Sequence, residues 1–193
     1  AGVVGEFMET NGLPHARLQE LGIGIGSRGS MKNRLAIPIR NKDDEIVAYC
    51  GRDVGLLDEA DEPKYKFPPK FRKDFELYGW NEAQNFERVV LVQSFLSVIK
   101  HGGLAAAIGD AGFGVASPMG TCIYDRQVEL LVETRPQVVV CFAGDDASHI
   151  GATQVATQLA HAGLWVTVRN CANGTKPQQM DSDEFCQLCG SDL

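Results

Sequence analysis

The sequence predicts an α/β fold: a parallel-core sheet flanked by helices, preceded by a small α+β subdomain with a β-hairpin. In the second half of the 193 residues, short apolar runs alternate with longer helical patterns, which is typical of a parallel sheet covered on both faces. In the first half, two strand-like runs flank a short polar turn, which indicates a hairpin. We expect the domains to be residues 1–85 and 86–193.

The expected first domain begins with short helices between residues 5 and 21. Asn11 and Gly12 interrupt the helical pattern, and Pro14 suits the first turn of the second helix, where a missing N–H costs nothing. Later in this domain an acidic loop precedes a basic, aromatic segment at 63–75. The strands of the hairpin are expected at 34–40 and 45–52.

The expected second domain alternates strands with helices. In such sheets, ligands bind beyond the carboxyl ends of the strands. Gln93 follows the first of these strands, and Ala143, Gly144 and Asp145 follow the third. We therefore expect these residues to lie at one edge of the sheet. The elements are expected at 88–92 (strand), about 94–109 (helix), 113–117 (strand), about 123–134 (helix), 137–142 (strand), about 148–162 (helix) and 164–169 (strand).

Composition indicates an ordinary globular protein, with 44% hydrophobic and 22% charged residues. No apolar run approaches the roughly 18 to 20 residues of a membrane span, and the first residues do not read as a signal peptide. We therefore expect a cytoplasmic protein without a membrane partner. The net charge of -7 argues against a protein that is basic all over, but it leaves room for a local basic patch.

Six cysteines are too few for a disulfide scaffold in a chain of this length, so reduced, packed thiols are expected. Cys186 and Cys189 form a Cys-x-x-Cys pair, but a structural zinc site needs four ligands. His149 and His161 are the candidates to complete one. We favour a helix that carries two cysteines over zinc binding or redox chemistry.

Residues 24–29 fit the string G-x-G-x-x-G, which in dinucleotide-binding proteins connects a strand to a helix. Here a strand-like run follows the glycines, so we favour a flexible connector.

The basic segment alternates cations with aromatic rings. Cations neutralise phosphates and rings stack on bases, a combination that single-stranded nucleic acid requires. The alternative is a solvated loop whose rings pack into the core. The cations are Lys64, Lys66, Lys70, Arg72 and Lys73, and the rings are Tyr65, Phe67 and Phe71.

Seven short motifs follow one another along the chain, at Leu35–Arg40, Ala48–Arg52, Pro63–Tyr65, Phe71–Lys73, Glu76–Gly79, Met119–Thr121 and Asp145–Ala147. In this order they resemble the RNA-polymerase region of bacterial DnaG-type primases, and the second half resembles a Toprim domain. The chain resembles especially the compact versions found after a zinc ribbon in phage, plasmid and mobile-element proteins. The resemblance covers nearly all of residues 5–185 and implies a Toprim-type sheet. It also places Arg52, Lys64 and Lys73 on positions that hold template in this family.

The chain departs from the Toprim pattern at its acidic positions. The pattern has carboxylates where this chain has Gln93, Ser97, Ala143 and Gln178, and a glycine where it has Ser94. Phosphoryl transfer needs divalent ions, and hard ions such as Mg²⁺ are held by carboxylate oxygens. The two residual aspartates, Asp145 and Asp146, are expected to hold at most one weakly bound Mg²⁺ or Mn²⁺, so no cofactor is assigned.

These observations favour a primase-like pseudoenzyme. The preferred function is a non-catalytic accessory to DNA replication or to a mobile element, which binds single-stranded DNA or primer-template. The alternatives are a scaffold for a helicase, polymerase or active primase, and an active primase in which Asp145, Asp146 and Asp181 or Asp183 hold metal in an altered geometry. The expected nucleic-acid-binding residues are Arg52, Lys64, Tyr65, Lys66, Arg72 and Lys73.

Overall fold

The computed structural model describes residues 2–57, 63–103 and 112–190, and the chain forms two compact units, Ala1–Phe71 and Arg72–Leu193. The units divide earlier in the chain than residue 85, so the segment at 72–85 packs with the second unit. The functional domain boundary at residue 85 stays a prediction.

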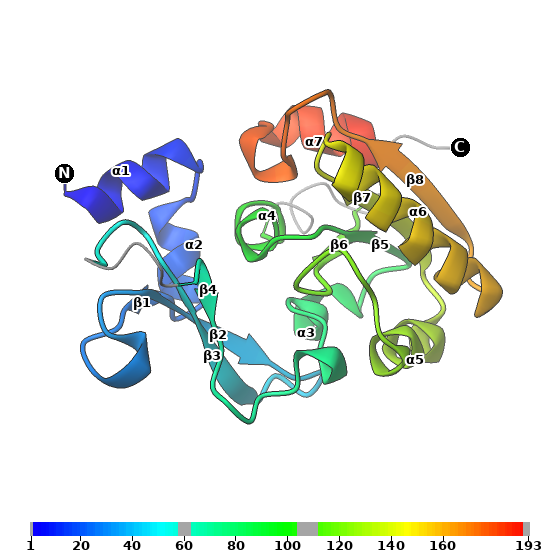
Figure 1. The fold of residues 1–193 in the computed structure, drawn as a ribbon. Helices are drawn as coiled ribbons and strands as arrows, with labels where there is room; N and C mark the ends of the chain where they lie inside the picture. Colours follow the sequence, from blue (N-terminus) through cyan, green and yellow to red (C-terminus); the bar gives the residue numbers. More distant parts are fainter. Residues whose placement is uncertain (1, 58–62, 104–111, 191–193) are drawn as a thin grey trace. The chain divides into compact units, whose positions relative to one another are not determined.

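The first unit contains an antiparallel sheet with strand order β1-β2-β3-β4 (Figure 1). The predicted hairpin is present, and Asn41 closes its turn by accepting hydrogen bonds from the N–H groups of Asp43 and Glu45. The first glycine of the G-x-G-x-x-G string lies in a short strand and the last begins a 3-10 turn, and the next element is a strand rather than an α-helix. The elements are α1 (Val3–Thr10), α2 (His15–Glu20), β1 (Gly24–Ile25), η1 (Gly29–Met31), β2 (Leu35–Arg40), β3 (Ile46–Arg52) and β4 (Tyr65–Lys66).

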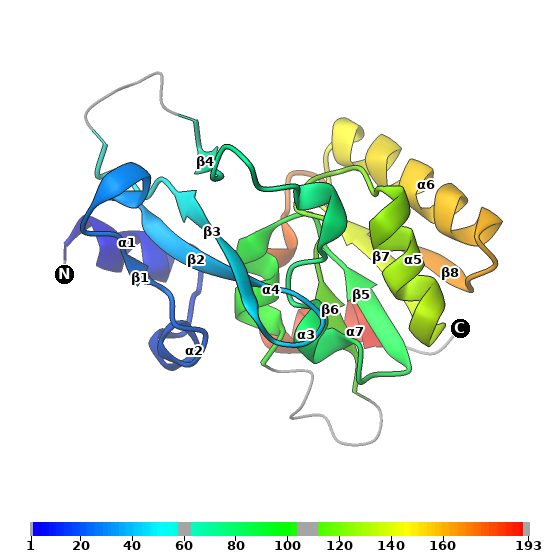
Figure 2. The same cartoon turned by 90° about the horizontal axis from the view of Figure 1, so that it is seen from below.

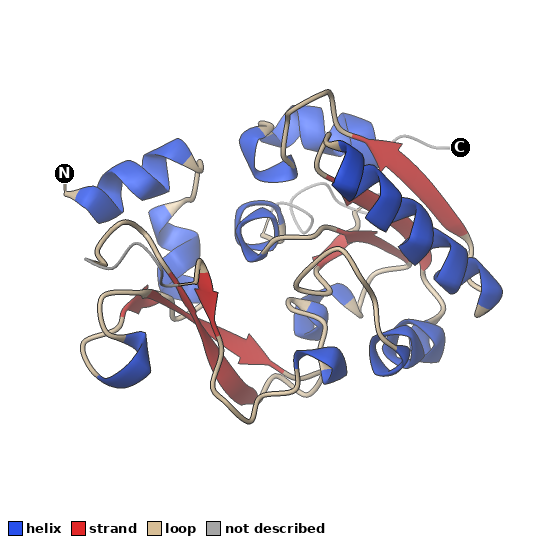
Figure 3. Cartoon of the chain, viewed as in Figure 1, coloured by secondary structure: helices blue, strands red, loops and turns tan. Residues whose placement is uncertain are grey.

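The second unit contains the predicted parallel sheet, with strand order β6-β5-β7-β8. Figure 3 shows the alternation of its helices and strands. The helix expected at about 94–109 ends at His101, and residues 104–109 lie outside the described part of the chain. The elements are η2 (Lys73–Phe75), α3 (Trp80–Ala83), β5 (Arg88–Leu91), α4 (Phe95–His101), β6 (Gly114–Ala116), α5 (Asp125–Thr134), β7 (Gln137–Phe142), α6 (Asp146–His161), β8 (Val166–Asn170), η4 (Pro177–Gln179) and α7 (Ser182–Gly190).

Helices cover both faces of this sheet, with α5 and α6 on one face and α4 and α7 on the other (Figures 1 and 2). Alternate residues of β5 and β7 point to opposite faces, so Leu91 and Val140 join the core formed with α5 and α6. On the other face, Phe113 and His101 pack against Phe185 of α7. None of the helices within 2–57, 63–103 and 112–190 is long and apolar enough to cross a bilayer.

Candidate functional site

The carboxyl ends of β5 and β7 meet, as the sequence predicted. The strands pair in parallel, and Gln93 Oε1 accepts a hydrogen bond from the backbone N–H of Ala143 at 2.9 Å. The side-chain amide of Gln93 therefore links the two strand ends through a hydrogen bond between uncharged groups. Its carbonyl oxygen is the only atom of this side chain that could bind a metal, and it carries no charge.

The loop after β8 closes over the end of β7. The N–H of Gly144 donates to the carbonyl of Thr175 at 2.8 Å, and the N–H of Gly174 donates back to the carbonyl of Gly144 at 2.9 Å. A Cβ atom on Gly144 would lie 2.0 Å from the carbonyl oxygen of Ala172. Only glycine fits here, because the backbone of the loop lies directly against it.

Two further positions of the expected site contact each other. Ser97 of α4 is fully buried, and its Oγ donates to Oε1 of Gln178, which is also buried, at 2.8 Å. The same loop is fixed to α4 through its backbone. Lys100 Nζ lies 3.0 Å from the carbonyl oxygen of Gln178, and His101 Nε2 lies 2.8 Å from that of Pro177. Burial lowers the pKa of Lys100, and it lowers the pKa of His101 to about 4.

Asp145 caps α6. One carboxylate oxygen accepts from the N–H of Ser148 at 2.9 Å, and the other accepts from the Ser148 hydroxyl at 2.9 Å. These hydrogen bonds to Ser148 lower the pKa of Asp145. An aspartate before a helix and an N–H donor three residues later are a common N-cap arrangement. Asp146 begins the helix and is exposed.

This donor set does not fit a pair of divalent ions. Gln93 and Gln178 each accept a hydrogen bond through the amide oxygen, and both oxygens of Asp145 accept from Ser148. Across the described residues, no group of three or more His, Cys, Asp or Glu side chains could hold a metal. Cys186 and Cys189 lie on α7, and within the described part of the chain they belong to no such group that could hold zinc.

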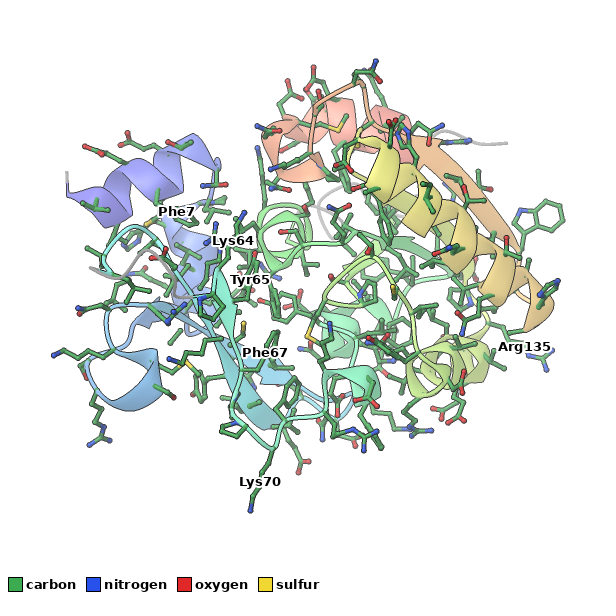
Figure 4. The ribbon with its side chains drawn as sticks, in the orientation of Figure 1. Phe7, Lys64, Tyr65, Phe67, Lys70 and Arg135 are labelled. Carbon is green, nitrogen blue, oxygen red and sulfur yellow. The ribbon has the colours of Figure 1, made fainter. Side chains whose placement is uncertain are left out.

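In the first unit, Arg52 lies against two aromatic rings. Its guanidinium carbon lies 5.2 Å from the ring centroid of Phe7 and 5.0 Å from that of Tyr65. Figure 4 shows these rings on α1 and β4, with Lys64 beside Tyr65 and Lys70 pointing into solvent. Arg52 is only 9% exposed, so it can position Tyr65 more readily than it can meet a phosphate.

Arg34 also fixes the basic segment, although the sequence reasoning did not single it out. It is buried, and its guanidinium donates to the carbonyl of Pro63 at 2.8 Å. A Cβ atom on Gly51 would lie 2.9 Å from Arg34 Cδ, so the glycine leaves room for the arginine stem. The sequence signal for this role is that Arg34 directly precedes the apolar run of β2.

In the second unit, Arg72 and Lys73 have different surroundings. Arg72 forms an ion pair with Asp74, with distances of 2.6 and 3.0 Å, and lies 4.8 Å from the ring centroid of Phe75. The ion pair lowers the pKa of Asp74. Lys73 Nζ lies 6.0 Å from the ring centroid of Tyr124. Arg72 is thus held on Asp74 by a bidentate contact, and Lys73 is not.

Known proteins are similar to this chain in both sequence and fold. Residues 3–84 match the family described as DNA primase catalytic core, N-terminal domain. A DNA primase of Geobacillus stearothermophilus is 31% identical over 173 residues, which are 85% of this chain and 26% of the relative. The chain spans about a quarter of the length of the curated relatives that it matches.

Solved structures of primases match nearly the whole of this chain. The Aquifex aeolicus primase, comprising zinc-binding and RNA polymerase domains, matches with a TM-score of 0.80 at 20% identity, covering 96% of this chain and 54% of that one. The chain has the fold of the DnaG-type primase catalytic core. A DnaG primase catalytic domain solved with bound ssDNA matches with a TM-score of 0.68 at 23% identity, covering 95% of this chain and 68% of that one.

The primase family match includes all six expected nucleic-acid-binding residues, because Arg52 through Lys73 lie within residues 3–84. The expected metal positions, from Gln93 to Gln178, lie after that range.

Proposed function

We propose that the protein is a primase-like, nucleic-acid-binding accessory of DNA replication or of a mobile element, with a Toprim-type second unit that no longer supports metal-dependent primer synthesis. One observation carries the proposal: Ser97 and Gln178, at two of the expected metal positions, form a buried neutral hydrogen bond at 2.8 Å. Two carboxylates so close would repel each other unless a metal or a proton lay between them. The neutral pair needs neither.

Nucleic-acid binding is supported by the similarity to a DnaG primase catalytic domain solved with ssDNA. Within the chain, the cations and rings of the basic segment supply phosphate neutralisation and base stacking. Arg52 and Arg34 hold this segment to the first unit, through Tyr65 and through Pro63. The start of the segment, at Pro63 and Tyr65, is therefore held in place before any ligand binds, which lowers the entropic cost of binding there.

The test is the affinity for fluorescent single-stranded DNA, measured by anisotropy in EDTA over a range of salt concentrations. We expect binding that weakens with salt, with a slope of about -0.7 per phosphate contacted. Lys64→Ala should reduce affinity and the slope. Lys42→Ala is the matched control, because residue 42 lies in the turn between β2 and β3, whereas β4 pairs with the other end of β3. Salt-independent binding, or equal losses in both variants, would contradict the proposal.

A second candidate function is a scaffold for a helicase, polymerase or active primase. The observation that favours it is Trp165, which is 68% exposed and directly precedes β8, an outer strand of the parallel sheet. Exposed tryptophans are frequent binding hot spots at protein interfaces. A partner that copurifies with the Lys64→Ala variant but not with Trp165→Ala would favour the scaffold. Template-directed primer synthesis that Asp145→Ala abolishes would instead favour an active primase.

A further inference from the structure

Tyr124 and Lys73 form a cation–aromatic pair at the carboxyl edge of the parallel sheet. Tyr124 directly precedes α5 and is 39% exposed, with Lys73 Nζ 6.0 Å from its ring centroid. A Cβ atom on Gly120 would lie 3.8 Å from Lys73 Nζ, so the ammonium also projects over the turn that follows β6. An exposed ring beside a cation can stack on a base while the cation meets the adjacent phosphate.

Gln127 fixes both members of this pair. Its side chain is fully buried, and Nε2 lies 3.0 Å from the carbonyl oxygen of Lys73, 2.8 Å from that of Glu76 and 3.4 Å from that of Pro118. Its Oε1 accepts from the N–H of Tyr124 at 3.1 Å. One buried amide therefore joins the start of α5, the segment that carries Lys73 and the turn after β6.

We propose that Tyr124 and Lys73 form a binding site for one nucleotide of a single strand, and that Gln127 is its positioning residue. Tyr124 stacks on the base, and Lys73 neutralises the phosphate next to it. This site rests on the proposed nucleic-acid-binding function and adds to it a residue outside the basic segment. It lies wholly within the second unit and needs no metal ion.

The test compares a single-stranded oligonucleotide with an abasic strand of equal length, whose sugar–phosphate chain lacks bases. Tyr124→Ala should weaken binding to the normal strand by roughly 5-fold or more, the lower end of base–aromatic stacking, and should leave the abasic strand unaffected. Lys73→Ala should weaken binding to both strands and reduce the salt slope by about 0.7. Tyr124→Phe keeps the ring and should keep the affinity.

Trp165→Ala is the matched control. It removes an exposed ring of the same unit at the amino end of β8, which is the opposite edge of a parallel sheet from Tyr124. This variant should bind both strands as the unaltered chain does.

Gln127→Glu separates positioning from stability. Glutamate can still accept from the N–H of Tyr124, but an ionised carboxylate cannot donate to the three carbonyls. The variant should therefore resemble Lys73→Ala, and adding Lys73→Ala to it should change affinity little further. Simple destabilisation would lower the melting temperature without removing the effect of Lys73→Ala.

The outcomes are distinguishable. If the unaltered chain binds DNA but Tyr124→Ala has no effect, or has equal effects on normal and abasic strands, the nucleotide site is wrong and the proposed function stands. If the unaltered chain does not bind DNA, both are wrong. The surface variants Tyr124→Ala and Lys73→Ala decide the question even if Gln127→Glu fails to fold, and thermal melting identifies that case.

Discussion

Ser97→Ala is expected to destabilise the second unit, because it leaves the amide oxygen of Gln178 buried without the hydroxyl that now lies 2.8 Å away. An unpaired buried acceptor costs about 1 to 3 kcal/mol. Alanine is the better helix former, but this gain within α4 is at most about 0.5 kcal/mol. The loss is the larger effect, so we expect the free energy of unfolding to fall by about 1 to 2 kcal/mol.

Urea unfolding followed by tryptophan fluorescence can measure this loss in the second unit alone. The chain has two tryptophans, Trp80 and Trp165, and both lie after residue 71. Trp80 is 2% exposed and Trp165 is 68% exposed. A Trp165→Phe background therefore leaves the buried Trp80 as the reporter of unfolding.

A double variant supplies the control. Gln178→Met replaces the buried amide by an apolar side chain of similar length, and removing both partners of a hydrogen bond can be nearly neutral. Adding Gln178→Met to Ser97→Ala should therefore recover part of the lost stability. The reasoning is refuted if Ser97→Ala changes the free energy of unfolding by less than about 0.3 kcal/mol, or if the two effects simply add.

Three further changes should follow from the same loop and strand ends. Asp145→Ala should lower stability whereas Asp145→Asn should not, since asparagine also caps helices; thermal melting of the two variants compares them. The free energy of unfolding should fall by up to roughly 3 kcal/mol as the pH is lowered from about 6.5 to about 4. In this window His101 takes up a proton in the unfolded chain, whereas burial lowers its pKa to about 4 and keeps it neutral in the fold. Urea midpoints measured against pH should therefore depend less on pH in His101→Gln. Gly144→Ala should cost about 1 to 3 kcal/mol by overpacking against Ala172, and an unchanged urea midpoint would show that the loop yields freely.

The sequence predicted the sheet because β5, β6 and β7 are largely buried apolar runs separated by helical periods. It also predicted that Gln93 and Ala143 would meet, since both follow parallel strands of the same sheet. The boundaries of α6 were less accurate: the helix starts at Asp146, earlier than expected. Asp145 followed three residues later by Ser148 is a typical N-cap pattern, but from the sequence we interpreted Asp145 only as a weak metal ligand.

Long-range contacts of single side chains could not be predicted from patterns. Ser97 and Gln178 are separated by 81 positions, and nothing in either neighbourhood specifies the other. Arg52 was expected at a phosphate, and no local pattern indicates that it lies against Phe7 and Tyr65. Gln127 had a weak signal, since it stands beside Val128 on the side of α5 that is buried. A buried amide needs several backbone partners, but which carbonyls these are depends on the tertiary fold.

Isothermal titration of the chain with Mn²⁺ tests the central claim most directly, namely that neutral side-chain hydrogen bonds have replaced a two-metal site at the ends of β5 and β7. We expect no stoichiometric binding of two ions, because uncharged amides stand at Gln93 and Gln178, and the carboxylate of Asp145 accepts two hydrogen bonds from Ser148. Tight binding of two ions per chain, lost in Asp145→Ala, would contradict the claim.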